Sequence, residues 1–281
     1  MPASLEGWID KIRDQLAQAS ETAGLDAQVL LARVLGRSRA WVLAHPDAEI
    51  SPEKIVELEQ KLARLVSGEP LPYVLGKWEF YGLDFVVTPA VLIPRPETEL
   101  LVEEALDWLK GHPTCRLACD AGTGSGCIAV ALAVNIPDLL VLASDISSAA
   151  LEVAERNVER YGLSGRVHLV QADLLPEFSR SFDLICANLP YIPTKTLEEL
   201  QVAKWEPRAA LDGGPDGLDQ IRRLLERART RLTPGGLLLV EIEAGQGASA
   251  AALAQERMPA AVVKILADLA GMDRLLKIQM Q

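Results

Sequence analysis

An amide side chain follows directly on an apolar run in the segment Asn188, Leu189, Pro190, Tyr191. The preceding residues, 182–187, are mostly apolar, which is typical of a central strand in a parallel sheet, where both faces are covered. Pro190 fixes its own φ at about −65° and disfavours the helical conformation at Leu189. We therefore expect Asn188 at the carboxyl end of a buried strand, which is the edge of an open α/β sheet where ligands bind.

Asn188 and Leu189 bring two hydrogen-bond acceptors to that edge, a side-chain oxygen and a backbone carbonyl. Together they could bind both N–H groups of a planar amide or amino group. Such a nitrogen is a poor nucleophile because its lone pair is delocalised, so positioning would supply much of the catalysis. The segment, with Tyr191 packing against the planar group, resembles the Asn-Pro-Pro-Tyr motif of methyltransferases that use S-adenosylmethionine to methylate such nitrogens.

A glycine-rich loop follows Asp120 and opens a predicted helix; it comprises Gly122, Thr123, Gly124, Ser125 and Gly126. Glycines let a backbone turn sharply and approach a ligand, and a helix N-terminus offers unpaired N–H groups. The loop predicts a nucleotide-like cofactor without saying which. Cys127 stands where the dinucleotide fingerprint needs a third glycine, and neither a P-loop nor a nucleophile elbow fits the loop.

Two acidic residues end the next two predicted strands. Asp145 lies 145 − 120 = 25 residues after Asp120, where a carboxylate can accept hydrogen bonds from both hydroxyls of a ribose. Asp173, next to Leu174, ends the following strand, where an adenine ring could be flanked. The alternative for Asp173 is a carboxylate that caps the following turn.

Strands and helices alternate from residue 116 onward. The predicted strands are residues 116–120, 139–145, 167–173, 182–188 and 236–242, and the predicted helices are residues 126–134, 148–161 and 218–232. This alternation predicts an α/β fold with a parallel, doubly wound sheet and right-handed crossovers. Residues 262–266 and 275–278 could add a last pair of strands.

The first third of the chain has a different pattern. Residues 1–72 show apolar residues at three- and four-residue steps and predict a small helical bundle; Ser51 and Pro52 mark one helix start. Residues 73–94 predict a β-hairpin linker with candidate strands at 73–75, 78–81 and 85–88, and residues 95–281 form the α/β domain. Thr98 could cap the helix that begins around residue 99.

Charge and composition exclude several classes of protein. The net charge is −11, and residues 1–72 carry 8 Lys and Arg against 11 Asp and Glu, a net of −3. This argues against binding nucleic acid chiefly by phosphate neutralisation. The longest apolar run, residues 127–134, is far shorter than the ~20 residues that span a bilayer. We expect a cytoplasmic protein whose four cysteines are buried thiols and whose histidines bind no metal.

Along nearly its full length the chain is similar to the protein-glutamine N5-methyltransferases of peptide-chain release factors, the PrmC or HemK family. The matching segments are Asp145 and residues 76–81, 92–99, 120–126, 188–191 and 206–217. The Arg-Pro-Glu-Thr-Glu stretch at residues 95–99 is specific to this family. The resemblance implies a helical domain that recognises the release factor, a hairpin linker and a Rossmann-like, seven-stranded methyltransferase domain. It also implies that the substrate is the glutamine of the factor's Gly-Gly-Gln loop.

The resemblance also assigns roles to residues. It puts Gly122 through Gly126, Asp145, Leu174 and Asn188 around the cofactor, and Asn188 through Tyr191 around the glutamine. Arg95 is a further candidate for substrate binding, the alternative being an ion pair with Glu97 or Glu99. Leu189 replaces the family's usual first proline but keeps the carbonyl, so we expect activity to be retained. Leu174 stands where some members carry an aromatic residue that would stack on adenine.

Other functions stay open on the residues alone. An adenine-N6 DNA or RNA methyltransferase would use a similar motif, because an adenine amino group poses the same chemical problem, but it would need base extrusion and phosphate contacts. The acidic charge counts against it. A dehydrogenase is disfavoured by Cys127, and a catalytically inactive binding module by the intact Asn188 and glycine loop.

Overall fold

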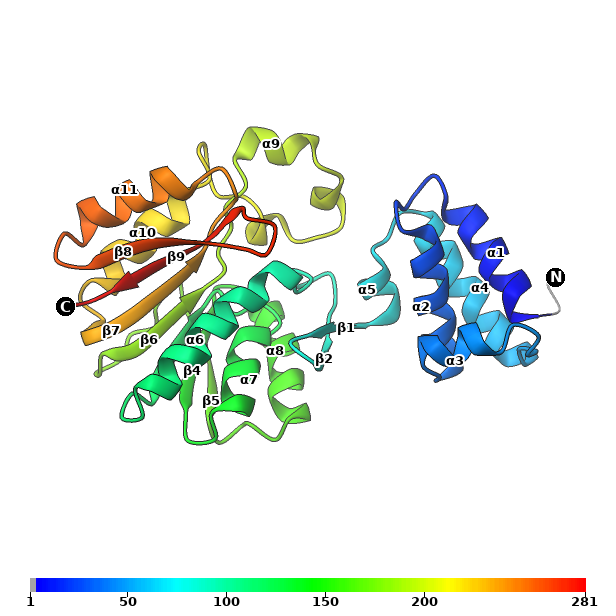
Figure 1. Ribbon diagram of the computed structural model, residues 1–281, viewed down its shortest axis with the longest axis horizontal. Coiled ribbons are helices and arrows are strands. Elements are labelled where there is room, and N and C mark those ends of the chain that lie inside the picture. The colour runs from blue at the N-terminus through cyan, green and yellow to red at the C-terminus, as the bar shows by residue number, and fades with distance from the viewer. Residues whose placement is uncertain (1–3) are drawn as a thin grey trace. The chain divides into compact units, whose positions relative to one another are not determined.

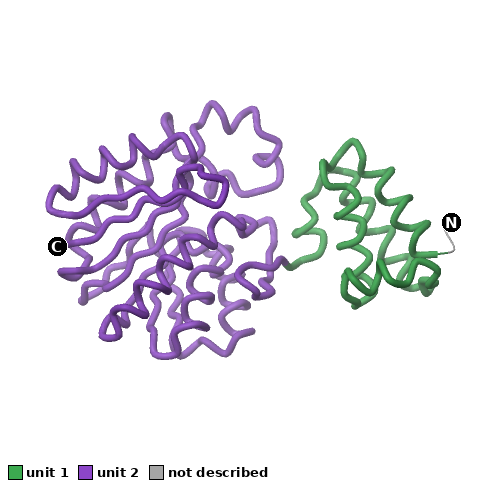
Figure 2. Tube along the Cα trace, in the orientation of Figure 1, with its two compact units in different colours: residues 1–77 green, residues 78–281 purple. Residues whose placement is uncertain are grey.

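The computed structural model describes residues 4–281; residues 1–3, which belong to the predicted helical domain, lie outside the described residues. The chain divides into two compact units, residues 1–77 and residues 78–281 (Figure 2). No helix within residues 4–281 is both long enough and apolar enough to cross a membrane.

The N-terminal unit is helical, as its apolar periodicity predicts. Its helices are α1 (Leu5–Leu16), α2 (Ala23–Leu35), α3 (Arg39–Ala44), α4 (Pro52–Val66) and α5 (Leu71–Leu75) (Figure 1). The predicted start of α4 is confirmed, since the Ser51 side chain accepts a hydrogen bond from the Lys54 N–H and Pro52 occupies the first turn. The predicted strand at residues 73–75 is wrong. Those residues lie in α5, which has Pro72 in its first turn and ends at Gly76 with φ of 72°.

A two-stranded hairpin follows, made of β1 (Lys77–Phe80) and β2 (Leu83–Val86). Tyr81 and Gly82 connect the strands with φ of 52° and 72°, both in the left-handed region that a tight hairpin turn of this hand requires. Phe80 and Phe85 are buried in the core of the C-terminal unit. The second strand therefore begins earlier than the predicted residues 85–88, because the turn takes only two residues.

The C-terminal unit is built on a seven-stranded sheet in the order β5-β4-β3-β6-β7-β9-β8. Its strands are β3 (Leu117–Ala121), β4 (Leu140–Asp145), β5 (Val167–Gln171), β6 (Phe182–Ala187), β7 (Leu232–Glu241), β8 (Val262–Ala267) and β9 (Asp273–Gln279). The first five are parallel, and β9 pairs antiparallel with β7 and β8. The predicted α/β fold is confirmed. Since β4 and β6 flank β3 on opposite sides, the order reverses at β3, where ligands bind in such sheets.

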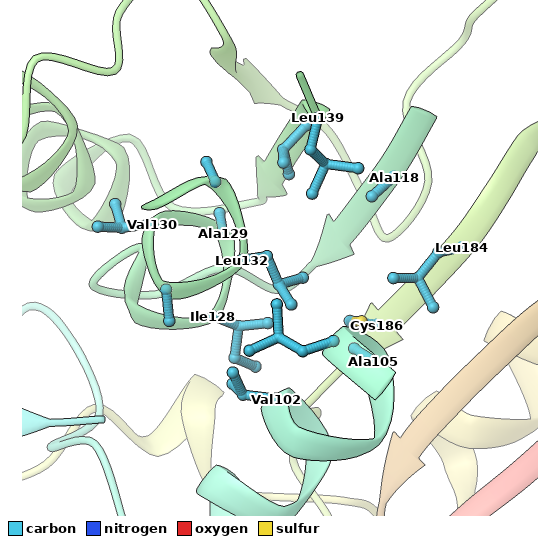
Figure 3. Close-up of a cluster of buried hydrophobic side chains, with 14 of the residues drawn as sticks. Val102, Ala105, Ala118, Ile128, Ala129, Val130, Leu132, Leu139, Leu184 and Cys186 are labelled. Carbon is cyan, nitrogen blue, oxygen red and sulfur yellow. The ribbon is translucent and has the colours of Figure 1, made fainter. Parts of the chain in front are cut away.

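Helices cover both faces of this sheet (Figure 1). They are α6 (Glu99–Gly111), α7 (Cys127–Asn135), α8 (Ser148–Arg160), α10 (Asp219–Ala228) and α11 (Gly247–Arg257). A further helix, α9 (Thr194–Glu199), lies away from the sheet after β6, and short 3-10 turns occur at Pro96–Thr98, Gln201–Lys204 and Arg208–Ala210. Alternate strand residues enter two separate cores, so that Leu184 packs with α6 and α7 (Figure 3) while Ile185 packs with α10 and α11. The predicted helix 218–232 is too long, because β7 already begins at Leu232.

Candidate functional site

The glycine loop leaves the carboxyl end of β3 and enters α7. Gly122, Gly124 and Gly126 have φ of 74°, 55° and 80°, a region that residues with side chains rarely adopt. At Gly122 the space is also closed, since an added Cβ would lie 2.9 Å from the Leu189 side chain. The N–H groups of Gly122 and Thr123 both donate to the Ser144 carbonyl at 2.8 Å, which joins the loop to β4.

Asp120 is fully buried beneath this loop. One carboxyl oxygen accepts from the Thr123 hydroxyl at 2.5 Å and from the Ala129 N–H at 3.2 Å, while the other has no partner among the described residues. Burial raises the pKa of Asp120 from 3.8 to about 6, against the lowering effect of the two hydrogen bonds. Asp120 therefore anchors the loop through its hydrogen bonds, and burial disfavours its charged form.

Replacing this carboxyl group tests that description. Because the pKa is raised in the folded state, Asp120 contributes stability that is fully present below about pH 4 and is lost as the pH rises through about 6. In the wild type this loss lowers the unfolding free energy by on the order of 3 kcal/mol between about pH 4 and pH 8. We expect Asp120→Asn to remove it. Urea denaturation of the full chain between pH 4 and 8 measures it. Asp107→Asn is the control, because the Asp107 side chain is 80% exposed, and it should keep the wild-type dependence of the unfolding free energy on pH. If Asp120→Asn also kept that dependence, the raised pKa of Asp120 would be contradicted.

Asp145 ends β4 beside the loop, as predicted. One carboxylate oxygen accepts from the Gly124 N–H at 2.9 Å and the other from the Ser147 N–H at 2.9 Å. A carboxylate offers about four lone-pair sites, so each oxygen keeps room for a further donor. The two backbone N–H groups thus fix the Asp145 side chain, and its oxygens can still accept hydrogen bonds from the two hydroxyls of a ribose.

Asp173 and Leu174 follow β5, and the turn-capping alternative for Asp173 does not describe its contacts. Its carboxylate pairs with Arg223 and with Arg227, the latter at 2.9 Å. Leu174 has φ of 61°, unusual for a branched residue, and its carbonyl accepts from the Ser144 hydroxyl. These contacts hold the Leu174 side chain in the cavity wall, and its role toward adenine stays a prediction.

Asn188 follows β6, at the carboxyl end predicted for it. Its side-chain N–H₂ donates to the Thr98 hydroxyl at 3.0 Å. The amide oxygen has no hydrogen bond within residues 4–281, and Asn188 lines the cavity described below. Thr98 was expected to cap α6, but its side chain makes no capping bond and accepts from Asn188 instead.

Tyr191, at the end of the same segment, is held at both its backbone and its ring. Its hydroxyl lies 3.3 Å from the Glu241 carboxylate, and its carbonyl accepts from the Gln246 side chain at 2.9 Å. Burial, more than the neighbouring Glu241 charge, raises the pKa of the Tyr191 hydroxyl well above its usual range. The ring is therefore neutral and fixed in position.

Arg95 does not pair with either acid of its alternative assignment, Glu97 or Glu99. Its partner is Glu206, which is almost completely buried and also accepts from the Ile93 N–H at 3.0 Å. Glu99 instead accepts from the Tyr81 N–H at 2.8 Å. Arg95 thus ties two loops together, and the alternative of an ion pair with Glu97 or Glu99 is wrong because the fold brings Glu206 closer. A role of Arg95 in substrate binding stays a prediction.

A cavity of about 350 Å³ opens where these elements meet. Of the predicted residues its lining includes Gly122, Thr123, Gly124, Ser125, Asp145, Asp173, Leu174, Asn188, Leu189 and Pro190. Within residues 4–281, the lining of this cavity does not include Gly126, Tyr191 or Arg95. A glycine loop that turns through positive φ, a carboxylate with free lone pairs and apolar walls fit a nucleoside cofactor such as S-adenosylmethionine.

Sequence reasoning assigned no role at this site to three groups. Ile146 lines the cavity directly after Asp145, Glu206 binds Arg95, and Glu241 lies behind Tyr191. A signal existed for Glu241, because it is a carboxylate at the carboxyl end of a buried strand, like Asp145. The pairing of Glu206 had no local signal, since Arg95 lies 111 residues away.

Comparisons with known proteins agree with these observations. A family model described as the PrmC N-terminal domain matches residues 7–76, and one described as a methyltransferase small domain matches residues 97–204. A methyltransferase from Pyrococcus furiosus shares the fold, with a TM-score of 0.51 and 20% identity over 79% of this chain and 98% of that one.

Curated relatives match over most of the chain. The release factor glutamine methyltransferase of Geobacter sulfurreducens is 46% identical over 85% of this chain and 84% of its own. That of Moorella thermoacetica is 44% identical over 94% of each chain. With this identity, this coverage and both family models in place, the chain belongs to the release factor glutamine methyltransferase (PrmC/HemK) family.

Proposed function

We propose that this chain transfers a methyl group from S-adenosylmethionine to the side-chain amide nitrogen, N5, of the glutamine in the Gly-Gly-Gln motif of class I peptide-chain release factors. The observation that carries the proposal is the orientation of Asn188. Because one N–H of its amide donates to Thr98, the amide nitrogen is oriented toward Thr98, and the amide oxygen is the acceptor left for a substrate N–H. Membership of the family supports the choice of substrate.

The cofactor would be held by the glycine loop and by the carboxylate of Asp145. Gly122 and Gly124 would present backbone to the cofactor where the loop lines the cavity, and Asp145 would accept from the ribose hydroxyls. Leu174 and Ile146 would flank the adenine with apolar surface. When bound, S-adenosylmethionine supplies an electrophilic methyl group on a sulfonium.

The substrate nitrogen would be bound by two acceptors, the Asn188 side-chain oxygen and the Leu189 carbonyl. Accepting from both N–H groups fixes the plane of the glutamine amide and turns the face of its nitrogen toward the cavity. Tyr191, whose hydroxyl is held by Glu241, would set the position of that plane. The nitrogen would gain one methyl group as the bond between that methyl and sulfur breaks, which leaves S-adenosylhomocysteine, and would give up one proton to water, so the product keeps a neutral amide.

Leu189 fits this role although it replaces a proline of the family motif. Its side chain is 4% exposed and packs against Gly122, so the turn is held by packing where the family uses a ring. Its carbonyl is available in either case, because proline and leucine have the same backbone acceptor. We propose that the carbonyl is what the reaction needs from this position.

We assign recognition of the release factor to the helical domain, residues 1–72, joined by the linker 73–94 to the methyltransferase domain 95–281. The competing substrate, the amino group of adenine in DNA or RNA, is less consistent with the net charge of −11. We therefore propose that the chain needs no direct contact with nucleic acid.

Intact-mass measurement of a purified release factor, incubated with the chain and S-adenosylmethionine, tests the proposal. We expect one added methyl group, located by fragmentation on the Gly-Gly-Gln glutamine. A factor with that glutamine replaced by alanine should stay unmodified. Methylation of an adenine-containing oligonucleotide, with none of the release factor, would refute the proposal in favour of the nucleic-acid substrate.

A further inference from the structure

A buried side-chain amide joins the end of the hairpin to the glycine loop. Asn157 lies in the last turn of α8 and is 0% exposed. Its oxygen accepts from the Val86 N–H at 2.7 Å, and its N–H₂ group donates to the Val86 carbonyl at 3.0 Å and to the Ser125 carbonyl at 2.8 Å. The amide thus uses both of its protons, and its partners are backbone groups of two segments that lie far apart in the sequence.

Both of these segments lead into the wall of the cavity. Ser125 lines the cavity itself. Val86 ends β2, and the turn that follows at residues 88–91 is closed by a backbone hydrogen bond of 3.0 Å. Residues 90–92, at the end of this turn, also line the cavity, whereas Asn157 is not in the lining within residues 4–281. The amide therefore joins two parts of the cavity wall from behind.

Two neighbours of Asn157 on the same face of α8 contact the same two segments. Ala154, one turn earlier, packs so closely against the glycine loop that a Cβ added at Gly126 would lie 3.3 Å from the Ala154 Cβ. One turn later, the Tyr161 hydroxyl donates to the Asp84 carbonyl of β2 at 2.9 Å. Asn157, between these two residues, is the side chain that bonds the hairpin and the loop at once.

An asparagine suits this position because its amide carries one acceptor and two donors in a plane. To Val86 it offers the pair of hydrogen bonds that a residue on a neighbouring strand would make. Its second proton remains for the Ser125 carbonyl. Breaking any of these bonds would leave a buried or half-buried backbone group without a partner, which is costly. The dimensions of the amide therefore fix the spacing between β2 and the glycine loop.

We propose that Asn157 is a positioning residue for S-adenosylmethionine, because it holds the glycine loop and residues 90–92 at the spacing that the cofactor needs. It acts through Ser125 and Val86 and does not contact the cofactor. The inference rests on the proposed function for its cofactor and not for its methyl acceptor. Since coupling between two sites is reciprocal, a bound cofactor also strengthens the attachment of the hairpin to the loop.

Removing the amide should weaken cofactor binding without slowing methyl transfer. We expect Asn157→Ala to raise the Kd for S-adenosylmethionine by about 10- to 30-fold in calorimetry, because the loop and residues 90–92 lose their common attachment. At saturating cofactor, kcat for release factor methylation should stay within about threefold of wild type, since the partners of Asn157 lie outside the segment at residues 188–191.

Two further variants separate this effect from a loosened hairpin and from lost stability. Tyr161→Phe removes the bond to the Asp84 carbonyl, so it weakens the hold on the hairpin alone. Val158→Ala shortens a buried side chain of α8 and should lower the free energy of unfolding in urea. In both variants the Kd should stay within about twofold of wild type. The proposal is overturned if Asn157→Ala binds as tightly as wild type, or if either control weakens binding as much as Asn157→Ala does.

Hydrogen exchange in the wild-type chain tests the coupling without any variant. We expect saturating S-adenosylhomocysteine to slow amide exchange at residues 83–87 by about fivefold or more, because the Val86 N–H donates to Asn157. In Asn157→Ala the same ligand should slow this exchange by less than about twofold. An unchanged rate in the wild type, or equal slowing in the variant, contradicts the proposal; the first result applies even if Asn157→Ala does not fold.

The proposed function can fail separately from this inference, because calorimetry and hydrogen exchange need no methyl acceptor. If the wild-type chain leaves the release factor unmodified while Asn157→Ala binds the cofactor at least about tenfold more weakly, the proposed substrate is wrong and the positioning role stands. If the factor is methylated and Asn157→Ala binds the cofactor like the wild type, the positioning role is wrong and the proposed function stands.

Discussion

The Asn188→Ala variant is expected to lose methyl transfer to the release factor by at least about 1000-fold, while its affinity for S-adenosylmethionine falls by less than about tenfold. Alanine removes the side-chain oxygen that would accept from one substrate N–H, leaving only the Leu189 carbonyl. The substrate amide could then rotate away from the line of attack. A radiolabelled-methyl assay measures turnover, and calorimetry with the cofactor alone measures affinity.

A matched control separates this loss from a general effect of removing an asparagine. Asn135 lies at the end of α7, where its side chain donates to the Ala131 carbonyl, outside the lining of the cavity. Asn135→Ala should keep turnover within about twofold of wild type. Unchanged turnover in Asn188→Ala would rule out a catalytic role for the amide, whatever the control shows.

The Gly122→Ala variant is expected to weaken S-adenosylmethionine binding by about 100-fold and to lower turnover with it. The added Cβ would lie 2.9 Å from the end of the Leu189 side chain, closer than real contacts allow, so either this buried side chain or the loop must shift. The backbone at φ of 74° adds strain of about 1–2 kcal/mol. Calorimetry with S-adenosylmethionine measures the loss of affinity.

Gly162→Ala is the control for backbone strain alone. Gly162 has φ of 66°, yet a Cβ there would meet nothing within 4 Å, and it follows α8 outside the lining of the cavity. We expect a similar loss of stability in urea denaturation and an unchanged cofactor affinity. Equal cofactor affinity in Gly122→Ala and wild type would show that cofactor binding does not need the loop conformation and the packing against Leu189 that glycine permits at position 122.

The sequence by itself determined the parts of the protein whose requirements are local. A glycine loop between an apolar strand and a helix needs positive φ, and Gly122, Gly124 and Gly126 all adopt it. Apolar runs of strand length separated by helical patterns required a sheet with both faces covered. The carboxyl ends of parallel strands meet at one edge, so the order of strands along the chain was enough to place Asp145 and Asn188 together.

The short segments before the sheet show where local patterns stop being informative. Residues 73–75 were predicted as a strand and form the end of α5, because a short apolar run does not distinguish a buried helix from a strand. The predicted boundary of the helix at residues 218–232 failed for a related reason. Leu232 continues the helical spacing of Leu225 and Ala228 although it already belongs to β7, so the apolar pattern carries no mark at the helix end.

Only the tertiary structure decided which polar side chains pair. Thr98 and Asn188 are 90 residues apart, and Arg95 and Glu206 are 111 apart, so each pair forms only after the sheet has brought its strand ends and loops together. Local reasoning offered nearer partners, a helix cap for Thr98 and the adjacent acids for Arg95. These nearer partners were wrong because a buried polar group must be paired inside the protein, where water is excluded. Which groups share that interior is determined by the fold. Tyr191 and Glu241, 50 residues apart, are brought together in the same way.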